Sequence, residues 1–134
     1  MSLKIVHLAT DAIAGMPFRL VKILREQTPY SVHLIETKQR NSYPQDIVFT
    51  NKKEEALDLL ASADIIHLHN NIDLDSTAFY PVNLRQLEQN GTKFVRQFHS
   101  EPAVLARKMG ITKDEVINSP IPSLVLGQFQ ERFY

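Results

Sequence analysis

The fold is decided by the stretch Ala63-Asp64-Ile65-Ile66-His67-Leu68-His69-Asn70, a short aliphatic run that ends in polar residues. The run is too short for a helix of ordinary length and predicts a buried strand. The segment before it, which begins at Asn51, and the segment after it, residues 82–89, carry apolar side chains at helical spacing. A buried strand between two helices is typical of parallel sheets joined by right-handed crossovers.

The same alternation recurs along the whole chain. Further strands are predicted at residues 4–9, 31–35, 46–49, 93–98 and 123–126. Helices are predicted at residues 17–26, after Asn51, at 82–89 and 102–108, and after Thr112, and an aromatic-rich turn is predicted at 128–134. The sequence therefore predicts one α/β domain over residues 1–134, with a doubly wound, mostly parallel, Rossmann-like sheet of about six strands.

Local signals mark several helix ends. Asn51 is followed by Glu54 at the spacing of a capping box, in which two side chains satisfy free amides at a helix N-terminus. Thr112 and Glu115 repeat this spacing. Asn90-Gly91 is predicted to end a helix, because these residue types tolerate the left-handed backbone that closes many helices.

Composition excludes several function classes. Hydrophobic residues make up 43% of the 134 positions and charged residues 22%, which is typical of a globular domain. The 15 basic and 15 acidic residues cancel, so no overall field favours nucleic acid. The absence of cysteine excludes disulfides, zinc ribbons, iron–sulfur clusters and thiol catalysis. No apolar run approaches the roughly 20 residues of a membrane span, and the first residues lack a signal-peptide layout, so we expect a cytoplasmic domain.

Candidate ligand sites are the loops at the carboxyl ends of the strands, where ligands bind in open parallel sheets. The loop at residues 9–16 lacks the three-glycine fingerprint of dinucleotide sites, and the chain contains no P-loop motif. Gly15 and Met16 precede a predicted helix, whose free amides attract anions, so they are candidates for contacting a phosphate. A turn glycine that only starts the helix is the alternative interpretation.

Histidines stand at the ends of two predicted strands. His67 and His69 alternate along one strand and therefore share one face. With His99 at the end of the next strand they would allow a three-imidazole metal site, but no carboxylate is placed to orient the rings, and we expect no metal. We expect His67 to be hydrogen-bonded in the core, and His69 and Asn70 to lie at the mouth of the site.

His99 is the leading candidate for a catalytic residue. It follows a strand and precedes Ser100, where an imidazole can donate a hydrogen bond to a sugar hydroxyl or accept a proton. A role limited to capping the strand end is the alternative. Ser100 lacks the glycine-flanked motif of a serine nucleophile, which argues against acyl transfer. His7 and His33 lie within strands and are interpreted as structural.

These segments, taken in order, resemble a known family. They are the opening strand Lys4-Ile5-Val6-His7-Leu8, Gly15 before the first helix, the stretch 63–70, and Lys93-Phe94-Val95-Arg96-Gln97-Phe98-His99. Their order and spacing are similar to the N-terminal half of GT-B-fold glycosyltransferases, in particular the retaining enzymes of family 4. The resemblance covers nearly the whole chain. It implies one of two Rossmann-like domains that face each other across a cleft, the N-terminal one binding mainly the acceptor and the C-terminal one the nucleotide sugar.

The resemblance also implies roles for individual residues. Gly15 and Met16 match the glycine-rich loop that approaches the donor diphosphate, although the family often has two adjacent glycines there. His99 matches the histidine that faces the donor sugar, and His69 and Asn70 match the segment that lines the acceptor side. Further substrate contacts are expected from Asp11, Arg19 and Glu101.

The function that the resemblance implies is the acceptor-binding half of a glycosyltransferase, acting on a glycan or a lipid-linked cell-envelope acceptor. The nucleotide-sugar domain is absent from this sequence, so we expect the chain to be inactive alone and to need a C-terminal GT-B domain or a partner chain. No cofactor is expected beyond the nucleotide-sugar co-substrate. A lipid-linked acceptor would place the domain at the inner face of the membrane, and an uncovered sheet edge would favour a homodimer.

Two other interpretations stay open. The chain would be a stand-alone binding or interaction module with a flavodoxin-like sheet if its last element were well covered. It would be a small metal-dependent hydrolase if His67, His69 and His99 held an ion, which metal analysis of the purified protein would reveal.

Overall fold

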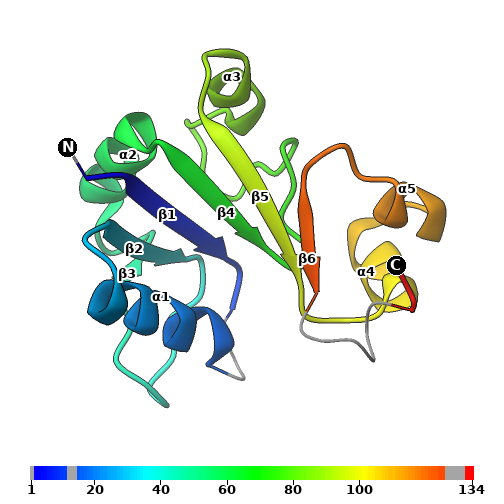
Figure 1. The fold of residues 1–134 in the computed structure, drawn as a ribbon, viewed down its shortest axis with the longest axis horizontal. Coiled ribbons are helices and arrows are strands. Elements are labelled where there is room, and N and C mark those ends of the chain that lie inside the picture. The colour runs from blue at the N-terminus through cyan, green and yellow to red at the C-terminus, as the bar shows by residue number, and fades with distance from the viewer. Residues whose placement is uncertain (1, 12–14, 126–131) are drawn as a thin grey trace.

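Six parallel strands form one sheet in the computed structural model, which describes residues 2–11, 15–125 and 132–134 (Figure 1). The strands are β1 (Lys4–Ala9), β2 (Ser31–Glu36), β3 (Ile47–Val48), β4 (Ile65–His69), β5 (Lys93–Phe98) and β6 (Ser123–Val125). Their order in the sheet is β3-β2-β1-β4-β5-β6, so the chain builds outward from β1 first in one direction and then in the other. This arrangement confirms the predicted doubly wound, Rossmann-like α/β fold.

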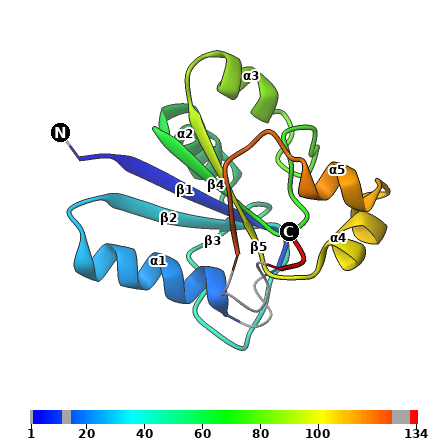
Figure 2. The same ribbon diagram turned by 45° about the vertical axis from the view of Figure 1, so that its right-hand side comes forward.

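Helices cover both faces of the sheet. They are α1 (Met16–Gln27), α2 (Lys53–Ser62), α3 (Leu84–Gln89), α4 (Pro102–Met109) and α5 (Lys113–Ile117). α1 packs on one face, α2 and α3 pack on the opposite face, and α4 and α5 lie beyond β6 (Figures 1 and 2). None of the helices in the described ranges combines the length and the apolar character that crossing a bilayer requires.

The alternation of side chains along the strands separates two apolar layers. Val6 of β1 belongs to a buried cluster with Leu60 of α2, whereas the preceding Ile5 belongs to a second cluster with Val21 of α1. His7 lies on the same face as Ile5, because side chains two residues apart in a strand point the same way. The face that α1 covers over β1 and β2 is therefore the face on which His7 is buried.

Predicted and observed boundaries differ by at most two residues. β1 and β5 span the predicted residues, and β4 begins at Ile65, two residues after the predicted start. Extension of the predicted last strand to Leu126, and most of the predicted turn at 128–134, lie outside the described residues.

The predicted capping box at Thr112 is confirmed. Its hydroxyl oxygen accepts a hydrogen bond from the Glu115 N–H at 3.2 Å, and the Glu115 carboxylate accepts from the Thr112 N–H at 2.7 Å. The predicted helix stop at Asn90-Gly91 is also confirmed, since Asn90 is the C-cap residue directly after α3 and Gly91 has a φ of 105°.

The predicted capping box at Asn51 and Glu54 is wrong. α2 starts two residues after Asn51, and its N-terminal flanking residue is Lys52, which makes no side-chain cap. The amides of Asn51 and Lys52 instead both donate to the Val48 carbonyl, at 3.0 and 3.1 Å. This turn after β3 delays the helix, so the spacing that matches a capping box falls outside the helix start.

Candidate functional site

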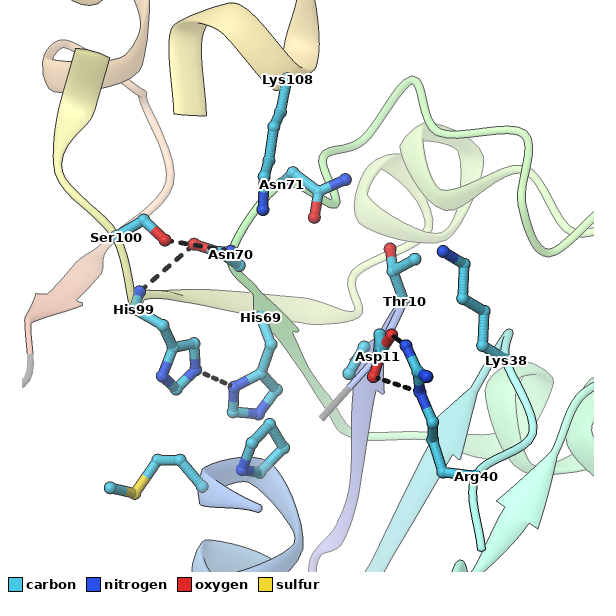
Figure 3. A pocket seen from close by; sticks show the side chains of 13 residues that line it. Thr10, Asp11, Lys38, Arg40, His69, Asn70, Asn71, His99, Ser100 and Lys108 are labelled. Carbon is cyan, nitrogen blue, oxygen red and sulfur yellow. Dashed lines mark hydrogen bonds and ion pairs between the residues drawn. The ribbon is translucent and has the colours of Figure 1, made fainter. Parts of the chain in front are cut away.

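A pocket of about 570 Å³ opens at the carboxyl ends of β1, β4 and β5 (Figure 3). This volume lies within the roughly 300–1,000 Å³ of small-molecule sites. β1 and β4 are the neighbouring strands from which the chain proceeds in opposite directions. The pocket therefore occupies the switch point at which ligands bind in doubly wound sheets.

One side of the pocket carries the imidazoles of His69 and His99. His69 ends β4, and His99 follows β5, which pairs with β4, so the sheet holds the two rings side by side (Figure 3). Nδ1 of His69 lies 2.8 Å from Nε2 of His99, and the ring centroids are 5.1 Å apart. This hydrogen bond needs one protonated and one bare nitrogen, so the tautomers of the two rings are linked.

Asn70 holds the ends of these two strands together. Its φ of 58° lies in the left-handed region, which asparagine tolerates better than most residues. Its N–H donates to the Gln97 carbonyl at 2.8 Å, and its side-chain Oδ1 accepts from the His99 N–H at 3.4 Å. Asn70 thereby positions the backbone of His99 beside the end of β4.

Across the pocket from the histidines lies an ion pair between Asp11 and Arg40 (Figure 3). Arg40 donates from Nε and Nη2 to the two carboxylate oxygens of Asp11. The hydrogen bond and the charge of Asp11 raise the guanidinium pKa above its usual value. Asp11 follows β1 and Arg40 follows β2, so the pair joins the ends of two neighbouring strands.

Two lysines reach the pocket from different elements. Lys38 belongs to the loop after β2, and Lys108 belongs to α4 (Figure 3). Neither ammonium group forms an ion pair with another residue in the part of the chain that the structure describes. The pocket therefore has positive charge at its rim that attracts an anionic group.

Behind the pocket, His69 continues into a cluster of three buried histidines, which we call the histidine cluster: His7, His67 and His69. His7 and His67 are direct partners in the pairing of β1 with β4. Nδ1 of His7 lies 2.9 Å from Nε2 of His69, and Nε2 of His67 lies 2.9 Å from the Oε1 of Gln97. The three rings stack on one another, with centroids 4.4 to 5.1 Å apart.

Burial keeps these imidazoles neutral near neutral pH. It lowers the pKa of His7 and of His69 well below 6.5, and neighbouring histidines lower both further. It lowers the pKa of His67 to about 4, although the hydrogen bond with Gln97 acts in the opposite direction. Burial also lowers the pKa of His99. A neutral imidazole keeps one bare nitrogen, which can accept a hydrogen bond or ligate a metal ion.

The structure brings most of the predicted site residues to this one pocket. Its lining includes Asp11, Met16, His69, Asn70 and His99. Neighbouring strands end at the same edge of a parallel sheet, which is why residues far apart in the sequence meet here.

Three other predicted residues lie outside the lining. Gly15 precedes α1 with a φ of 72°, the left-handed backbone that favours glycine. Arg19 is exposed on α1, and its Nε lies 3.9 Å from the position that a Cβ at Gly15 would occupy. Glu101 is exposed at the start of α4 and makes no side-chain cap. Contacts of these residues with a ligand stay predictions.

Two further predictions concern histidines in the sheet. His67 is buried and hydrogen-bonded to Gln97, as predicted for a core histidine. His33 is half-buried on β2, where it contacts the Ser31 hydroxyl at 3.1 Å and lies 4.0 Å from the Asp46 carboxylate. These surroundings agree with the structural role that the sequence suggested for His33.

Sequence reasoning missed the cations and one member of the histidine cluster. Lys38 and Arg40 follow β2, which ends at the same sheet edge as β1, so the strand-end rule could have found them. Lys108 lies within a helix, and no local signal points to it. His7 joins His67 only through the pairing of β1 with β4, which the sequence pattern does not specify.

No family model matches the chain, and comparisons with curated proteins and with solved structures find no match either. The similarity of the sequence motifs to glycosyltransferases therefore stays a prediction. The functional interpretation rests on those motifs and on the geometry of the pocket.

Proposed function

We propose that the chain is the acceptor-binding half of a GT-B-type glycosyltransferase, which transfers a sugar from a nucleotide-sugar donor to a glycan or lipid-linked acceptor. The observation that supports this proposal most is that Met16, His69, Asn70 and His99 line one pocket. They come from the segments whose order and spacing resemble that family. The strand order and the position of the pocket at the switch point agree with such a half.

In this proposal His99 donates a hydrogen bond to a hydroxyl of the reacting sugar or accepts a proton from it. Its imidazole is neutral, and Nε2 contacts Nδ1 of His69. When His69 donates this hydrogen bond, His99 accepts at Nε2 and carries its own proton on Nδ1. Nδ1 of His99 is then the donor available to a sugar hydroxyl in the pocket, and His69 sets the tautomer that makes it so.

Acceptor recognition would come from the polar groups around the histidines. Asn70 and Asn71 line the pocket with carboxamides, which both donate and accept hydrogen bonds as sugar hydroxyls do. Lys38 and Lys108 add charge that would favour an acceptor or donor with a phosphate. A small number of polar groups placed in this way fixes the orientation of a ligand.

Transfer requires a donor held against this acceptor. Positioning two reactants lowers the activation free energy of a bimolecular reaction by up to roughly 7–11 kcal/mol. In the family that the sequence resembles, the donor is held mainly by a second domain. We therefore expect the chain to bind an acceptor but to transfer no sugar by itself.

The test is an NMR titration of the isotope-labelled chain with two sets of probes, a panel of nucleotide sugars and a panel of short oligosaccharides. We expect an oligosaccharide to shift the amide signals of His69, Asn70 and Ser100, and nucleotide sugars to bind weakly or not at all. His99→Ala should abolish the oligosaccharide shifts. His33→Ala, on the opposite face of the sheet, should preserve them.

Three outcomes would contradict the proposal. Tight binding of a nucleotide sugar that is lost in His99→Ala would mean that the chain holds a complete donor site. Sugar transfer by the purified chain would have the same meaning. Failure of every oligosaccharide to perturb the pocket would remove the acceptor-binding role.

A further inference from the structure

Three imidazoles converge behind the pocket in a way that neither the fold nor the proposed function requires. Each of His7, His67 and His69 offers one ring nitrogen, and these nitrogens all lie within 4.8 Å of one another. The three side chains are 0%, 8% and 2% exposed. The convergence is a consequence of sheet register, because His7 lies opposite His67 and His69 follows two residues later on the same face.

We propose that the histidine cluster, His7, His67 and His69, binds one divalent transition-metal ion, with Zn²⁺ as the best-fitting ion. Three imidazole ligands and one open position form a set that zinc adopts in proteins. The ion would lie behind His69, on the same face of the sheet as α1. Its fourth coordination position would be available to water or to a ligand group.

The spacing of the nitrogens is close to that of a zinc site. Zinc holds imidazole nitrogens at about 2.0–2.1 Å in a tetrahedron, which separates the ligand atoms by about 3.3 Å. Nδ1 of His7 and Nε2 of His69 already lie 2.9 Å apart. The rings stack without the ion, so binding requires small rotations that draw the third nitrogen inward by about 1–1.5 Å.

The hydrogen bonds around the cluster select its ligand atoms. Nε2 of His67 donates to the Oε1 of Gln97, which leaves Nδ1 of His67 bare. Nδ1 of His69 pairs with His99, which leaves Nε2 of His69 as the ligand atom facing His7. Outer partners of this kind commonly fix the tautomer and the ring orientation of zinc-bound histidines.

His7 supplies an independent sign that the cluster is incomplete. Its Nε2 is buried and has no hydrogen-bond partner among the described residues. Buried polar atoms are nearly always satisfied in folded proteins, so an unsatisfied one in such a cluster needs an explanation. An ion whose His7 ligand atom is Nε2, after a rotation of the ring, would provide one, whereas an ion at Nδ1 would leave Nε2 unsatisfied.

The chemistry of the cluster suits a borderline metal ion. Imidazole favours zinc, copper, nickel and iron over magnesium and calcium, which prefer oxygen ligands. Burial keeps the three rings in their neutral form, which is the form that ligates metal. An ion can reach the cluster through the pocket, because His69 lines both.

The test is a titration of the full, tag-free chain with Zn²⁺ after treatment with a chelator, followed by calorimetry and thermal unfolding. We expect one equivalent to bind and to raise the unfolding temperature, since an ion that binds only the folded state stabilises it. Co²⁺ should give the intense visible absorption of a tetrahedral site. Gln97→Ala should weaken Zn²⁺ binding roughly 10–100-fold, as loss of an outer partner does.

Substitution of a ligand histidine should weaken Zn²⁺ binding more than Gln97→Ala does. We expect His67→Gln and His69→Gln to abolish the one-equivalent binding, whereas His33→Gln should bind Zn²⁺ as the unmodified chain does. His33 is a matched control because it lies on β2 with its side chain on the opposite face of the sheet from His7. Equal loss in His33→Gln would overturn the proposal.

A measurement on the unmodified chain covers the case in which the variants do not fold. X-ray absorption at the zinc edge, with one equivalent bound, should count three imidazole ligands. Binding through one or two imidazoles, or no stoichiometric binding of Zn²⁺ or Co²⁺, would overturn the proposal. In that case the cluster would be a hydrogen-bonded chain of imidazoles without metal. Zinc binding by three imidazoles would support the metal site and would not test the glycosyltransferase proposal. The sugar titration tests that proposal separately.

Discussion

The Oε1 of Gln97 lies 2.9 Å from Nε2 of His67, and this contact joins β5 to β4 inside the sheet. It satisfies one nitrogen of a ring that is 8% exposed. His67 therefore folds into the core as a neutral imidazole, and its protonation would place a charge among apolar and stacked neighbours. This cost makes the stability of the chain depend on pH.

The metal-free chain should lose stability as the pH falls below 6.5. The pKa of His67 is about 4 in the folded state, so between pH 6.5 and 4 the unfolded chain binds a proton that the folded chain does not. This difference lowers the free energy of unfolding by about 3 kcal/mol across that window, and contributes nothing above it. His7 and His69 act in the same direction.

Urea unfolding in the presence of a chelator would measure this dependence. His67→Gln should flatten the loss between pH 6.5 and 4, because glutamine has no proton to gain. Identical pH profiles for the two proteins would show that His67 does not titrate as the burial indicates.

The fold was predictable because its strands are locally distinct. β1 and β5 are short runs rich in aliphatic or aromatic residues, and the helices between strands carry apolar stripes, so the strand spans and the doubly wound class follow from pattern alone. The wrong prediction of a capping box at Asn51 and Glu54 has a local cause. A turn closed by the Val48 carbonyl precedes the helix, and the turn and the capping box use the same residue types.

The candidate site was predictable only in part. The strand-end rule selects His69, Asn70 and His99, since it depends only on where apolar runs stop. Lys108 depends on how α4 packs beside the sheet, and His7 depends on the register of β1 against β4. Packing and register are tertiary properties, so no reading of local sequence could supply them.

Leu60→Ala should destabilise the chain strongly. Leu60 is fully buried between α2 and the sheet, and removing its branched end leaves a cavity, which costs about 2–5 kcal/mol. Ile23→Ala on α1 is the matched control, because Ile23 is 54% exposed and should change stability little. Chemical unfolding of both variants checks this, and comparable losses would mean that α2 does not pack as described.

Thr112→Ala should cost about 1 kcal/mol through loss of the N-terminal cap of α5. Thr112→Ser retains the hydroxyl that accepts from the Glu115 N–H and should recover most of this loss. Denaturant midpoints of the two variants test the prediction. A threonine-to-serine change as damaging as the alanine change would show that the methyl group, and not the cap, stabilises the helix.

Asn70→Val should destabilise the chain and disturb the pocket. Asn70 has a φ of 58°, and a β-branched side chain in that left-handed backbone costs roughly 1–2 kcal/mol. Asn70→Gly should restore the backbone without restoring the side-chain contact to the His99 N–H. Amide signals of His99 and Ser100 should therefore move in both variants, whereas the loss of stability should be confined largely to Asn70→Val.

Inorganic pyrophosphate should bind the pocket weakly and in a salt-dependent way. Lys38 and Lys108 line it from two elements, and neither has a described acidic partner. A unit charge about 4 Å from an anion contributes about 1 kcal/mol in water, so Lys38→Met and Lys108→Met should each weaken binding about fivefold. The control Lys93→Met removes an exposed lysine at the start of β5, at the opposite edge of the sheet, and should leave the affinity unchanged.

The same titration at higher ionic strength separates electrostatic attraction by Lys38 and Lys108 from nonspecific binding of pyrophosphate. Screening by salt should weaken pyrophosphate binding to the unmodified chain more than binding to the double variant Lys38→Met/Lys108→Met, because the double variant has lost the charges that salt screens. Equal weakening in Lys93→Met would place the anion elsewhere on the surface. Binding that is insensitive to all three substitutions would mean that the backbone at the start of α1, rather than the two lysines, attracts the anion.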